Sequence, residues 1–232
     1  MFFWYSKNMM LRIFAWKAED QDFTRETWRR YLSEDRLQKA SGMKAGKARQ
    51  LFLGAEILLN QSLERIGAQT AVPAAYTRNP HGKPYLCGKE GLYVNWSHSG
   101  DCVLCGLSDR EIGVDLQRME KEPGAGLIRK ALQPEELVLY ERTEETQRKS
   151  LFYAYWTVKE SFLKAKGTGF AASLDTFYVN LEGPCPEVVP RDKNEPYTCR
   201  ILEGIEDYAA AVCIQGAAEG LKEHPLIEWN GL

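Results

Sequence analysis

The chain carries no surplus of charge of either sign. Its 30 lysines and arginines stand against 32 aspartates and glutamates, which gives a net charge of −2 at pH 7. Proteins that bind nucleic acid in general carry a clear basic surplus, so this balance argues against that class. The chain has 232 residues, 44% of them hydrophobic and 27% charged, which is ordinary for a globular protein with a sizeable core.

Long hydrophobic runs are also absent. No stretch approaches the roughly eighteen apolar residues that cross a membrane. The apolar segment 1–10 lacks a basic start and a small-residue cleavage site, so it makes a poor signal peptide. Translation could start at Met1, Met9 or Met10, and the last two would open directly on an expected strand at 11–16. These features predict a cytoplasmic protein.

The six cysteines form no regular framework. Cys102 and Cys105 have CxxC spacing, but they lie in an apolar run that we expect to be a strand. Residues three apart in a strand face opposite sides, so the pair is badly placed for one metal ion or one disulfide. With three histidines in the chain and no second CxxC, a zinc site is not indicated, and we expect buried, reduced thiols.

Hydrophobic periodicity predicts two long helices. Apolar residues recur at helical spacing over 46–66 and again over 147–166, and a glycine follows each run. The remaining expected elements are short helices at 24–32, after Ser33 and from Pro134, and strands at 11–16, 92–96, 102–107, 111–117, 177–181, 197–202 and 208–214. Tight turns at 99–101 and 108–110 predict that three of these strands form a meander.

The order of these elements predicts an α+β fold of two similar lobes. Each half of the chain holds one long helix and about three strands, although no sequence repeat is evident. We place the lobes at 1–112 and 113–232. Since no Ser/Gly-rich linker separates them, we expect the lobes to pack closely and to form a site between them.

Two acidic segments carry the strongest chemical signal. Glu160 and Lys164 are four residues apart on the second long helix and share a face. An exposed Glu–Lys pair is common, but the aromatic neighbours here indicate burial. Asp115 ends a strand and points away from Val114 and Leu116, although an edge-strand aspartate facing water is the alternative. Together the two carboxylates offer the hard oxygen ligands that suit Mg²⁺ beside a phosphate.

Several polar and basic residues could bind a phosphate. Ser97 and His98 end a strand, where they can donate hydrogen bonds, and a Ser–His nucleophile–base pair or a structural histidine are the alternatives. Lys83 is a point charge in a rigid Gly-Lys-Pro loop. A basic group precedes and enters the first long helix: Arg36, Lys39 and Arg49. The alternative for this group is a solvated helix face.

Read in order, the motifs are Gly82-Lys83-Pro84, Trp96-Ser-His-Ser-Gly100, Gly113-Val-Asp115 and Trp156-Thr-Val-Lys-Glu-Ser-Phe-Leu-Lys164. This series resembles the 4′-phosphopantetheinyl transferases of the surfactin-synthetase-activating type, over roughly residues 30–215. The resemblance implies a pseudodimer of two α+β lobes with the active site between them. It also implies transfer of the 4′-phosphopantetheine arm of coenzyme A to a serine of an apo acyl or peptidyl carrier protein, with release of adenosine 3′,5′-bisphosphate.

The same resemblance implies roles for the motif residues. Asp115 and Glu160 would hold Mg²⁺ on the pyrophosphate, and Glu160 would be the base for the carrier serine, directly or through water. Lys164 would contact the phosphates and help to move the proton. The residues matched to coenzyme A binding are Lys83, Ser97, His98, Lys164, Arg36 and Lys39, and by a looser match Arg49. His98, Arg36 and Lys39 would lie near the 3′-phosphate.

One position departs from the family pattern. Many members of this type have a glutamate where this chain has Gln117, so one negative charge is missing from the expected metal site. The amide could supply a carbonyl oxygen or hold a metal-bound water. We therefore expect weaker Mg²⁺ binding rather than loss of activity.

The resemblance also implies a partner. Carrier proteins of this family are acidic helical domains of fatty-acid, polyketide or peptide synthesis, and the segment 119–137, with basic residues among apolar ones, is the expected docking surface. We expect a monomer, because both walls of the site come from one chain. A non-catalytic coenzyme A or carrier-protein binder on the same fold is the second hypothesis, supported by Gln117 alone. An unrelated Mg²⁺-dependent phosphohydrolase is the third.

Overall fold

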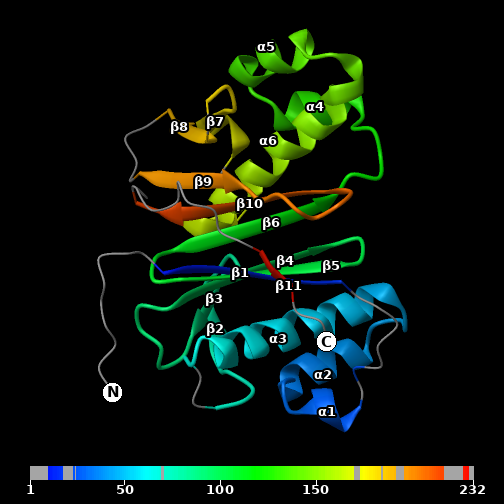
Figure 1. Ribbon diagram of the computed structural model, residues 1–232, viewed down its shortest axis with the longest axis vertical. Coiled ribbons are helices and arrows are strands. Elements are labelled where there is room, and N and C mark those ends of the chain that lie inside the picture. The colour runs from blue at the N-terminus through cyan, green and yellow to red at the C-terminus, as the bar shows by residue number, and fades with distance from the viewer. Residues whose placement is uncertain are drawn as a thin grey trace.

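The computed structural model describes residues 10–17, 23, 25–68, 71–169, 173–183, 185–191, 196–216 and 227–229. Two sheets lie face to face at the centre of the molecule, and a long helix covers the outer face of each (Figure 1). The layers are therefore helix, sheet, sheet and helix. This is the α+β class that the order of elements predicts.

The first sheet has the strand order β11-β1-β5-β4. Strand β1 pairs antiparallel with β5 and parallel with β11, and β4 pairs antiparallel with β5. Helix α3 covers this sheet (Figure 1). The elements of this half are β1 (Leu11–Lys17), α1 (Glu26–Arg29), α2 (Glu34–Ser41), α3 (Lys47–Arg65), the hairpin β2 (Tyr76–Arg78) and β3 (Pro84–Leu86), β4 (Tyr93–Ser99), β5 (Cys102–Ser108) and β11 (Ile227–Trp229).

The second sheet has the strand order β6-β10-β9, with both pairs antiparallel. Helix α6 covers it, and α4 and α5 lie beside the N-terminal half of α6 (Figure 1). The elements of this half are β6 (Ile112–Arg118), α4 (Ala125–Ala131), α5 (Pro134–Arg142), α6 (Glu145–Lys166), the 3₁₀ turn η2 (Leu174–Thr176), the hairpin β7 (Phe177–Asn180) and β8 (Glu187–Pro190), β9 (Tyr197–Ile201) and β10 (Tyr208–Gln215).

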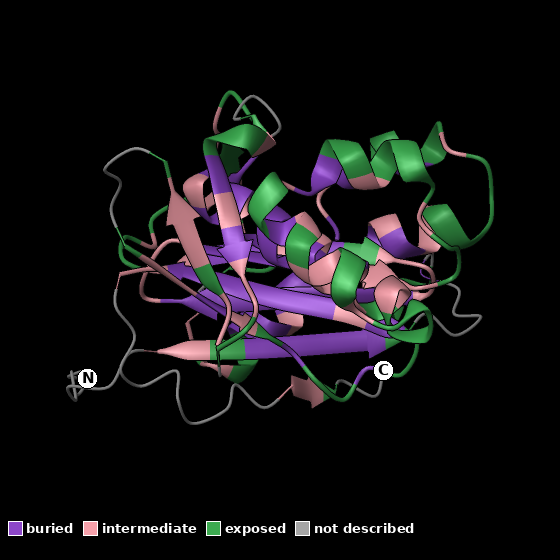
Figure 2. Ribbon diagram, turned by 90° about the horizontal axis from the view of Figure 1, so that it is seen from above, coloured by how far each residue is buried: buried purple, intermediate pink, exposed green. Residues whose placement is uncertain are grey.

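Strand alternation divides the apolar residues among three cores. In β1, Ile13 and Ala15 face the second sheet, whereas Phe14 and Trp16 face α3. A third core lies between the second sheet and α6. The central strands are accordingly buried almost throughout, whereas the peripheral helices expose one face (Figure 2). None of the described helices is long and apolar enough to cross a membrane.

The prediction of a three-stranded meander is wrong for its last strand. Strands β4 and β5 form the expected hairpin, but β6 crosses to the second sheet and pairs with β10. Its neighbour in the first sheet is β4, which it contacts without main-chain pairing. Periodicity identified β6 as a strand, but it carries no information on which sheet a strand joins.

Both long helices lie where the periodicity predicts them. Ser33 caps α2 by accepting a hydrogen bond from the Arg36 amide, and α5 begins at Pro134 as expected. Helix α4 and the short strands β2, β3, β8 and β11 were not predicted. Strand β11 follows β10 in sequence but joins the first sheet through β1.

The cysteine prediction is confirmed in part. Cys102 and Cys105 are buried and face opposite cores, as residues three apart in a strand should. Cys199 and Cys213 are also buried. The prediction of burial is wrong for Cys87, which is exposed in a turn outside the sheets, and Cys185 is only partly buried.

Gly113 allows α6 to lie directly on β6. A Cβ atom at this position would stand 2.0 Å from the carbonyl oxygen of Ser161 and 2.3 Å from the amide nitrogen of Ala165. Any larger residue would push the helix away from the strand. This close contact brings Asp115, two residues along β6, next to the α6 residues of the same motif series.

Candidate functional site

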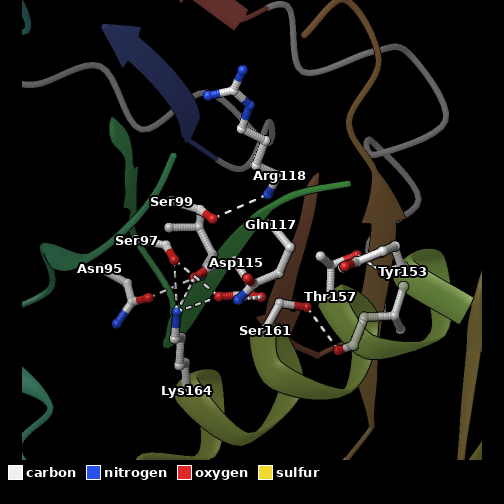
Figure 3. A network of polar contacts seen from close by, with 12 residues as sticks. Asn95, Ser97, Ser99, Asp115, Gln117, Arg118, Tyr153, Thr157, Ser161 and Lys164 are labelled. Carbon is white, nitrogen blue, oxygen red and sulfur yellow. Dashed lines mark hydrogen bonds and ion pairs between the residues drawn. The ribbon is translucent and has the colours of Figure 1, made fainter. Parts of the chain in front are cut away.

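Asp115 and Lys164 form the centre of the candidate site. Lys164 Nζ lies 2.6 Å from Asp115 Oδ1 and donates further hydrogen bonds to Ser97 Oγ at 3.0 Å and to the Val114 carbonyl at 3.1 Å (Figure 3). The Ser97 hydroxyl donates to the same Oδ1 atom at 2.9 Å. Asp115 is only 2% exposed. The three side chains come from β4, β6 and α6, so both halves of the chain build this cluster.

Alternate residues of β4 join the two sheets through their side chains. Asn95 Oδ1 accepts a hydrogen bond from the Val114 amide at 2.9 Å, and Ser99 Oγ accepts one from the Arg118 amide at 3.0 Å (Figure 3). Ser97 lies between them and bonds Asp115. This seam replaces main-chain pairing between β4 and β6, and it fixes the position of Asp115 relative to the first sheet.

Glu160 lies one turn before Lys164 on α6 and is 8% exposed. Its Oε1 atom is buried and has no hydrogen-bond partner among the described residues. Burial raises the pKa of Glu160 to about 7. The negative charge of Asp115 adds to this rise, and the positive charge of Lys164 opposes it. A buried carboxylate oxygen without a donor is costly, so this atom is suited to a cation or a proton that arrives with a ligand.

A cavity of about 250 Å³ opens beside Glu160 and Lys164. Its other walls come from the β2–β3 hairpin loop, from β4 and from the end of α6: Arg78, His81, Gly82, Lys83, Pro84, Asn95, Trp96, Leu163, Gly167 and Gly169. The larger side chains of these walls include the cations Arg78 and Lys83 and the ring of Trp96. Such a lining is suited to a ligand that combines phosphate groups with a ring system.

Arg36 and His98 lie near the cations Arg78 and Lys164, which line the cavity. The Arg36 guanidinium stacks 3.7 Å from the centre of the Phe52 ring, and its buried Nε atom has no hydrogen-bond partner among the described residues. Burial lowers the pKa of Arg36, and the nearby Arg78 lowers it further. His98 is exposed, yet desolvation and then the charges of Lys164 and Arg36 lower its pKa. An anion between these groups would relieve their repulsion.

The other three predicted coenzyme A residues differ in how far they are buried and in the partners they already have. Lys83 lines the cavity, but its buried ammonium group already pairs with the Glu111 carboxylate and donates to the Ala165 carbonyl. Lys39 is exposed and forms a 2.7 Å ion pair with Asp35 one turn earlier on α2. Arg49 is half-buried near the start of α3.

Gln117 lies next to the central cluster but at its edge. Its Nε2 atom is 3.4 Å from Asp115 Oδ2, the carboxylate oxygen that Lys164 does not bond (Figure 3). Amide nitrogen and oxygen exchange places by a 180° rotation, so the same side chain can offer its carbonyl oxygen. Among the described residues there is no group of three or more His, Cys, Asp or Glu side chains that could hold a metal ion.

Lys159, beside Glu160 in the last motif, faces away from the cavity. It is 1% exposed, and its Nζ atom bonds Glu136 Oε2 and the Ala131 carbonyl, each at 2.6 Å. Lys159 thus contacts α4 and α5, whereas its neighbour Glu160 lines the cavity. Lys159 belongs to the Trp156–Lys164 motif, but the sequence predicts no role for it.

Sequence reasoning also missed Arg78. It lies over the Tyr76 and Trp96 rings, with its guanidinium carbon 5.3 and 5.4 Å from their centres, and donates to the Gly82 carbonyl at 2.6 Å. The one available signal was its place in the loop that leads to Lys83. The alternation of Asn95, Ser97 and Ser99 was a readable signal for the seam, since residues two apart share a strand face.

Comparisons with known proteins agree with these motifs. The model of the 4′-phosphopantetheinyl transferase superfamily matches residues 111–213. A 4′-phosphopantetheinyl transferase of Bacillus subtilis is 32% identical over 157 residues, which cover 62% of this chain and 69% of that protein. The 4′-phosphopantetheinyl transferase Sfp of Bacillus subtilis strain 168 is 26% identical over 72% of this chain and 74% of its own length. A solved holo-(acyl-carrier-protein) synthase of Bacillus anthracis, in complex with coenzyme A (3′,5′-ADP), has a TM-score of 0.40 and 18% identity over 46% of this chain and 96% of that chain.

Proposed function

The chain belongs to the 4′-phosphopantetheinyl transferase superfamily, and from this membership we propose that it transfers the 4′-phosphopantetheine arm of coenzyme A to a serine of an apo carrier protein. The second product is adenosine 3′,5′-bisphosphate, and the reaction depends on Mg²⁺. The observation that carries the proposal is the buried Glu160 oxygen, which has no partner in the described part of the chain and lies beside the Asp115–Lys164 pair at the wall of a cavity. The two halves of the chain act as the lobes of a pseudodimer with the site between them.

The donors present fit a magnesium ion. Asp115 Oδ2 is free of Lys164, Glu160 Oε1 has no partner among the described residues, and Gln117 can turn its carbonyl oxygen toward them. Mg²⁺ needs few protein ligands because it keeps several waters and binds substrate phosphates. When bound, it would neutralise pyrophosphate charge and stabilise the leaving phosphate.

Glu160 is the proposed base. The carrier serine oxygen forms a bond to the phosphorus that carries the pantetheine arm, and the bond from that phosphorus to the bridging oxygen breaks. The bridging oxygen keeps the electron pair and leaves as part of adenosine 3′,5′-bisphosphate. The serine proton passes to the Glu160 carboxylate, directly or through water.

Cationic side chains bind the phosphates in this proposal. Lys164 contacts the pyrophosphate from the position where it now bonds Asp115, while Ser97 holds both of these side chains in place. The 3′-phosphate lies near His98 and near the basic residues of the first half: Arg36, Lys39, Arg78 and, less directly, Arg49. Lys83 acts from the cavity wall, where its bond to the Ala165 carbonyl also orients the end of α6.

The carrier protein docks on segment 119–137. Within it, Lys121, Arg129 and Lys130 are exposed, and Leu127 is 43% exposed between them. Exposed cations around an exposed leucine suit an acidic helical domain, because charge steers the encounter and apolar contact holds it. We propose that the enzyme works as a monomer in fatty-acid, polyketide or peptide synthesis.

The test is to incubate the protein with coenzyme A, Mg²⁺ and apo acyl carrier or peptidyl carrier proteins. Intact mass spectrometry should show each accepted carrier gaining one phosphopantetheine arm, and EDTA should prevent the gain. Glu160→Gln should abolish the gain, whereas Glu145→Gln, an exposed glutamate on the same helix, should not. No gain on any carrier, with coenzyme A bound, would favour a non-catalytic binder, the reading that Gln117 supports.

A further inference from the structure

Lys159 and Glu136 form the most deeply buried ion pair at the edge of the docking segment. The Lys159 side chain is 1% exposed and that of Glu136 is fully buried, and Lys159 Nζ lies 2.6 Å from Glu136 Oε2. The same Nζ atom donates to the carbonyl of Ala131, the last residue of α4, at 2.6 Å. One lysine of α6 therefore bonds both α4 and α5.

Glu136 also bonds backbone groups at the start of α5 and in β7. Its Oε2 atom also accepts a hydrogen bond from the Gln133 amide at 2.6 Å, which caps α5. Its Oε1 atom accepts one from the Val179 amide in β7 at 2.7 Å. The end of α4, the start of α5, β7 and α6 thus meet at one pair of charges, which no step of the proposed reaction uses.

Two other contacts between α6 and the docking segment are weaker and more exposed. Tyr153 donates its hydroxyl to the Lys121 carbonyl at 3.1 Å, and Lys149 Nζ lies 3.7 Å from Glu122 Oε1. Both join the start of the segment to the first half of α6. An exposed ion pair of this kind contributes little to stability.

A buried ion pair is weak evidence for stability, because an apolar pair of the same shape is often as good. A better-supported role for such pairs is to select one arrangement of the elements they join. Here the elements are the proposed docking segment and the helix of Glu160. Lys159 and Glu160 are neighbours on α6. The Lys159 side chain points to the docking segment, and the Glu160 side chain points to the cavity.

We propose that Lys159 and Glu136 are positioning residues for the carrier protein: they hold α4 and α5 in one orientation relative to Glu160, so that the docked carrier presents its serine to that carboxylate. This inference rests on the proposed function. It predicts that loosening the pair disturbs the carrier substrate and leaves coenzyme A, which binds on the other side of α6, largely unaffected.

The test uses the double variant Lys159→Met with Glu136→Gln. Lys159→Met alone leaves an unpaired buried carboxylate and can fail to fold, whereas the double variant buries no charge. With apo acyl carrier protein and coenzyme A varied in turn, we expect the KM for the carrier to rise about tenfold, since small misplacements of a substrate have effects of this size. The KM for coenzyme A should stay within about twofold of the wild-type value.

A second readout does not depend on turnover. Amide hydrogen exchange in α4 should be about tenfold faster in the double variant than in the wild type, while exchange in α3 should not change. The matched control is Lys149→Met, which removes a half-buried lysine of the same helix from an exposed ion pair with the same segment. We expect the control to leave both KM values and the exchange of α4 near those of the wild type.

The outcomes separate the two proposals. If the wild type loads no carrier, the proposed function fails. If the wild type loads carriers and the folded double variant keeps its carrier KM, or keeps the protection of α4, the positioning role is overturned. If both KM values rise together, the pair acts on the whole fold and the positioning role is again overturned.

Discussion

Two lysine–carboxylate pairs on α6 have the same separation and opposite surroundings. Lys159 and Glu136 are 2.6 Å apart with both side chains at 1% exposure or less. Lys164 and Asp115 are also 2.6 Å apart, but the lysine side chain is 28% exposed and lines a cavity. The Lys159 ammonium group and both oxygens of Glu136 are hydrogen-bonded to buried backbone or side-chain atoms. Beside the second pair, Glu160 keeps a buried oxygen without a partner among the described residues.

The two pairs can therefore play different roles. The Lys159–Glu136 pair is closed to solvent. It cannot exchange partners without leaving a charge unpaired in the protein interior, so it fixes the structure around it. The Lys164–Asp115 pair is open to the cavity. This open pair can exchange partners, because a ligand or cation that enters the cavity can replace one bond of Lys164 or Asp115. Ion-pair distance alone does not distinguish the two, whereas access to a cavity and an unpartnered neighbour do.

Asp115→Asn should break the open pair with the largest effect on activity. The substitution removes the charge that Lys164 bonds and a proposed ligand of Mg²⁺, at nearly constant volume. We expect kcat/KM for transfer to fall about 10⁴-fold, equivalent to about 5 kcal/mol of transition-state stabilisation. The measurement is the rate of carrier loading, with the exposed Asp175→Asn as the control. Activity within tenfold of the wild type would remove Asp115 from the metal site.

Replacing each lysine by methionine should separate the roles of the two pairs. Lys159→Met leaves the Glu136 carboxylate buried and unpaired, so we expect the free energy of unfolding to fall by about 4 kcal/mol. Lys164→Met also leaves a buried carboxylate, but Asp115 keeps the Ser97 hydroxyl as a donor, so we expect a smaller loss of about 2 kcal/mol. It should nevertheless lower kcat more than a hundredfold. Urea unfolding and loading rates measure the two effects, and equal stability losses would erase the distinction.

The pH dependence of stability tests the electrostatics of the open site. The pKa of Glu160 is raised from 4.5 to about 7 on folding, so the folded state holds this proton more tightly than the unfolded state. The resulting stabilisation is complete below pH 4.5 and is lost as the pH rises through 7. The loss amounts to at most about 3 kcal/mol. In EDTA, Glu160→Gln should therefore be more stable than the wild type at pH 8 and similar to it at pH 4.5. Urea unfolding at both pH values checks this, and parallel profiles would contradict the raised pKa.

Part of this comparison could be predicted from the sequence. Helical spacing placed Glu160 and Lys164 on one face, and strand alternation turned Asp115 away from its apolar neighbours, as the structure has them. Strand alternation also placed Cys102 and Cys105 on opposite faces, where the structure has them. These are local rules, and they succeed because each depends only on residues a few positions apart.

The rest depends on contacts between distant residues. Nothing near Lys159 in the sequence indicates that its partner is Glu136, and nothing near β6 indicates that it leaves β5 for β10. The Gly-Lys-Pro loop predicts Lys83 as a point charge for a phosphate, but it does not predict that the ammonium group pairs with Glu111, which precedes β6. Partners of this kind are set by packing of whole layers, which a pattern of single residues does not encode.

Gln117→Glu should produce the smallest effect and sharpen the account of the open pair. The new carboxylate would face Asp115 Oδ2, which the amide nitrogen now faces at 3.4 Å, and a third negative charge would strengthen the attraction for a divalent cation. We expect Mg²⁺ to bind about tenfold more tightly, a gain of about 1.4 kcal/mol, and the Mg²⁺ concentration for half-maximal loading to fall accordingly. Gln117→Leu, which has no oxygen to offer, should shift both quantities in the opposite direction. Titration with Mn²⁺ followed by electron paramagnetic resonance measures the affinity without turnover. If both variants keep the wild-type affinity, Gln117 contacts neither the ion nor its waters, and the site works with two carboxylates alone.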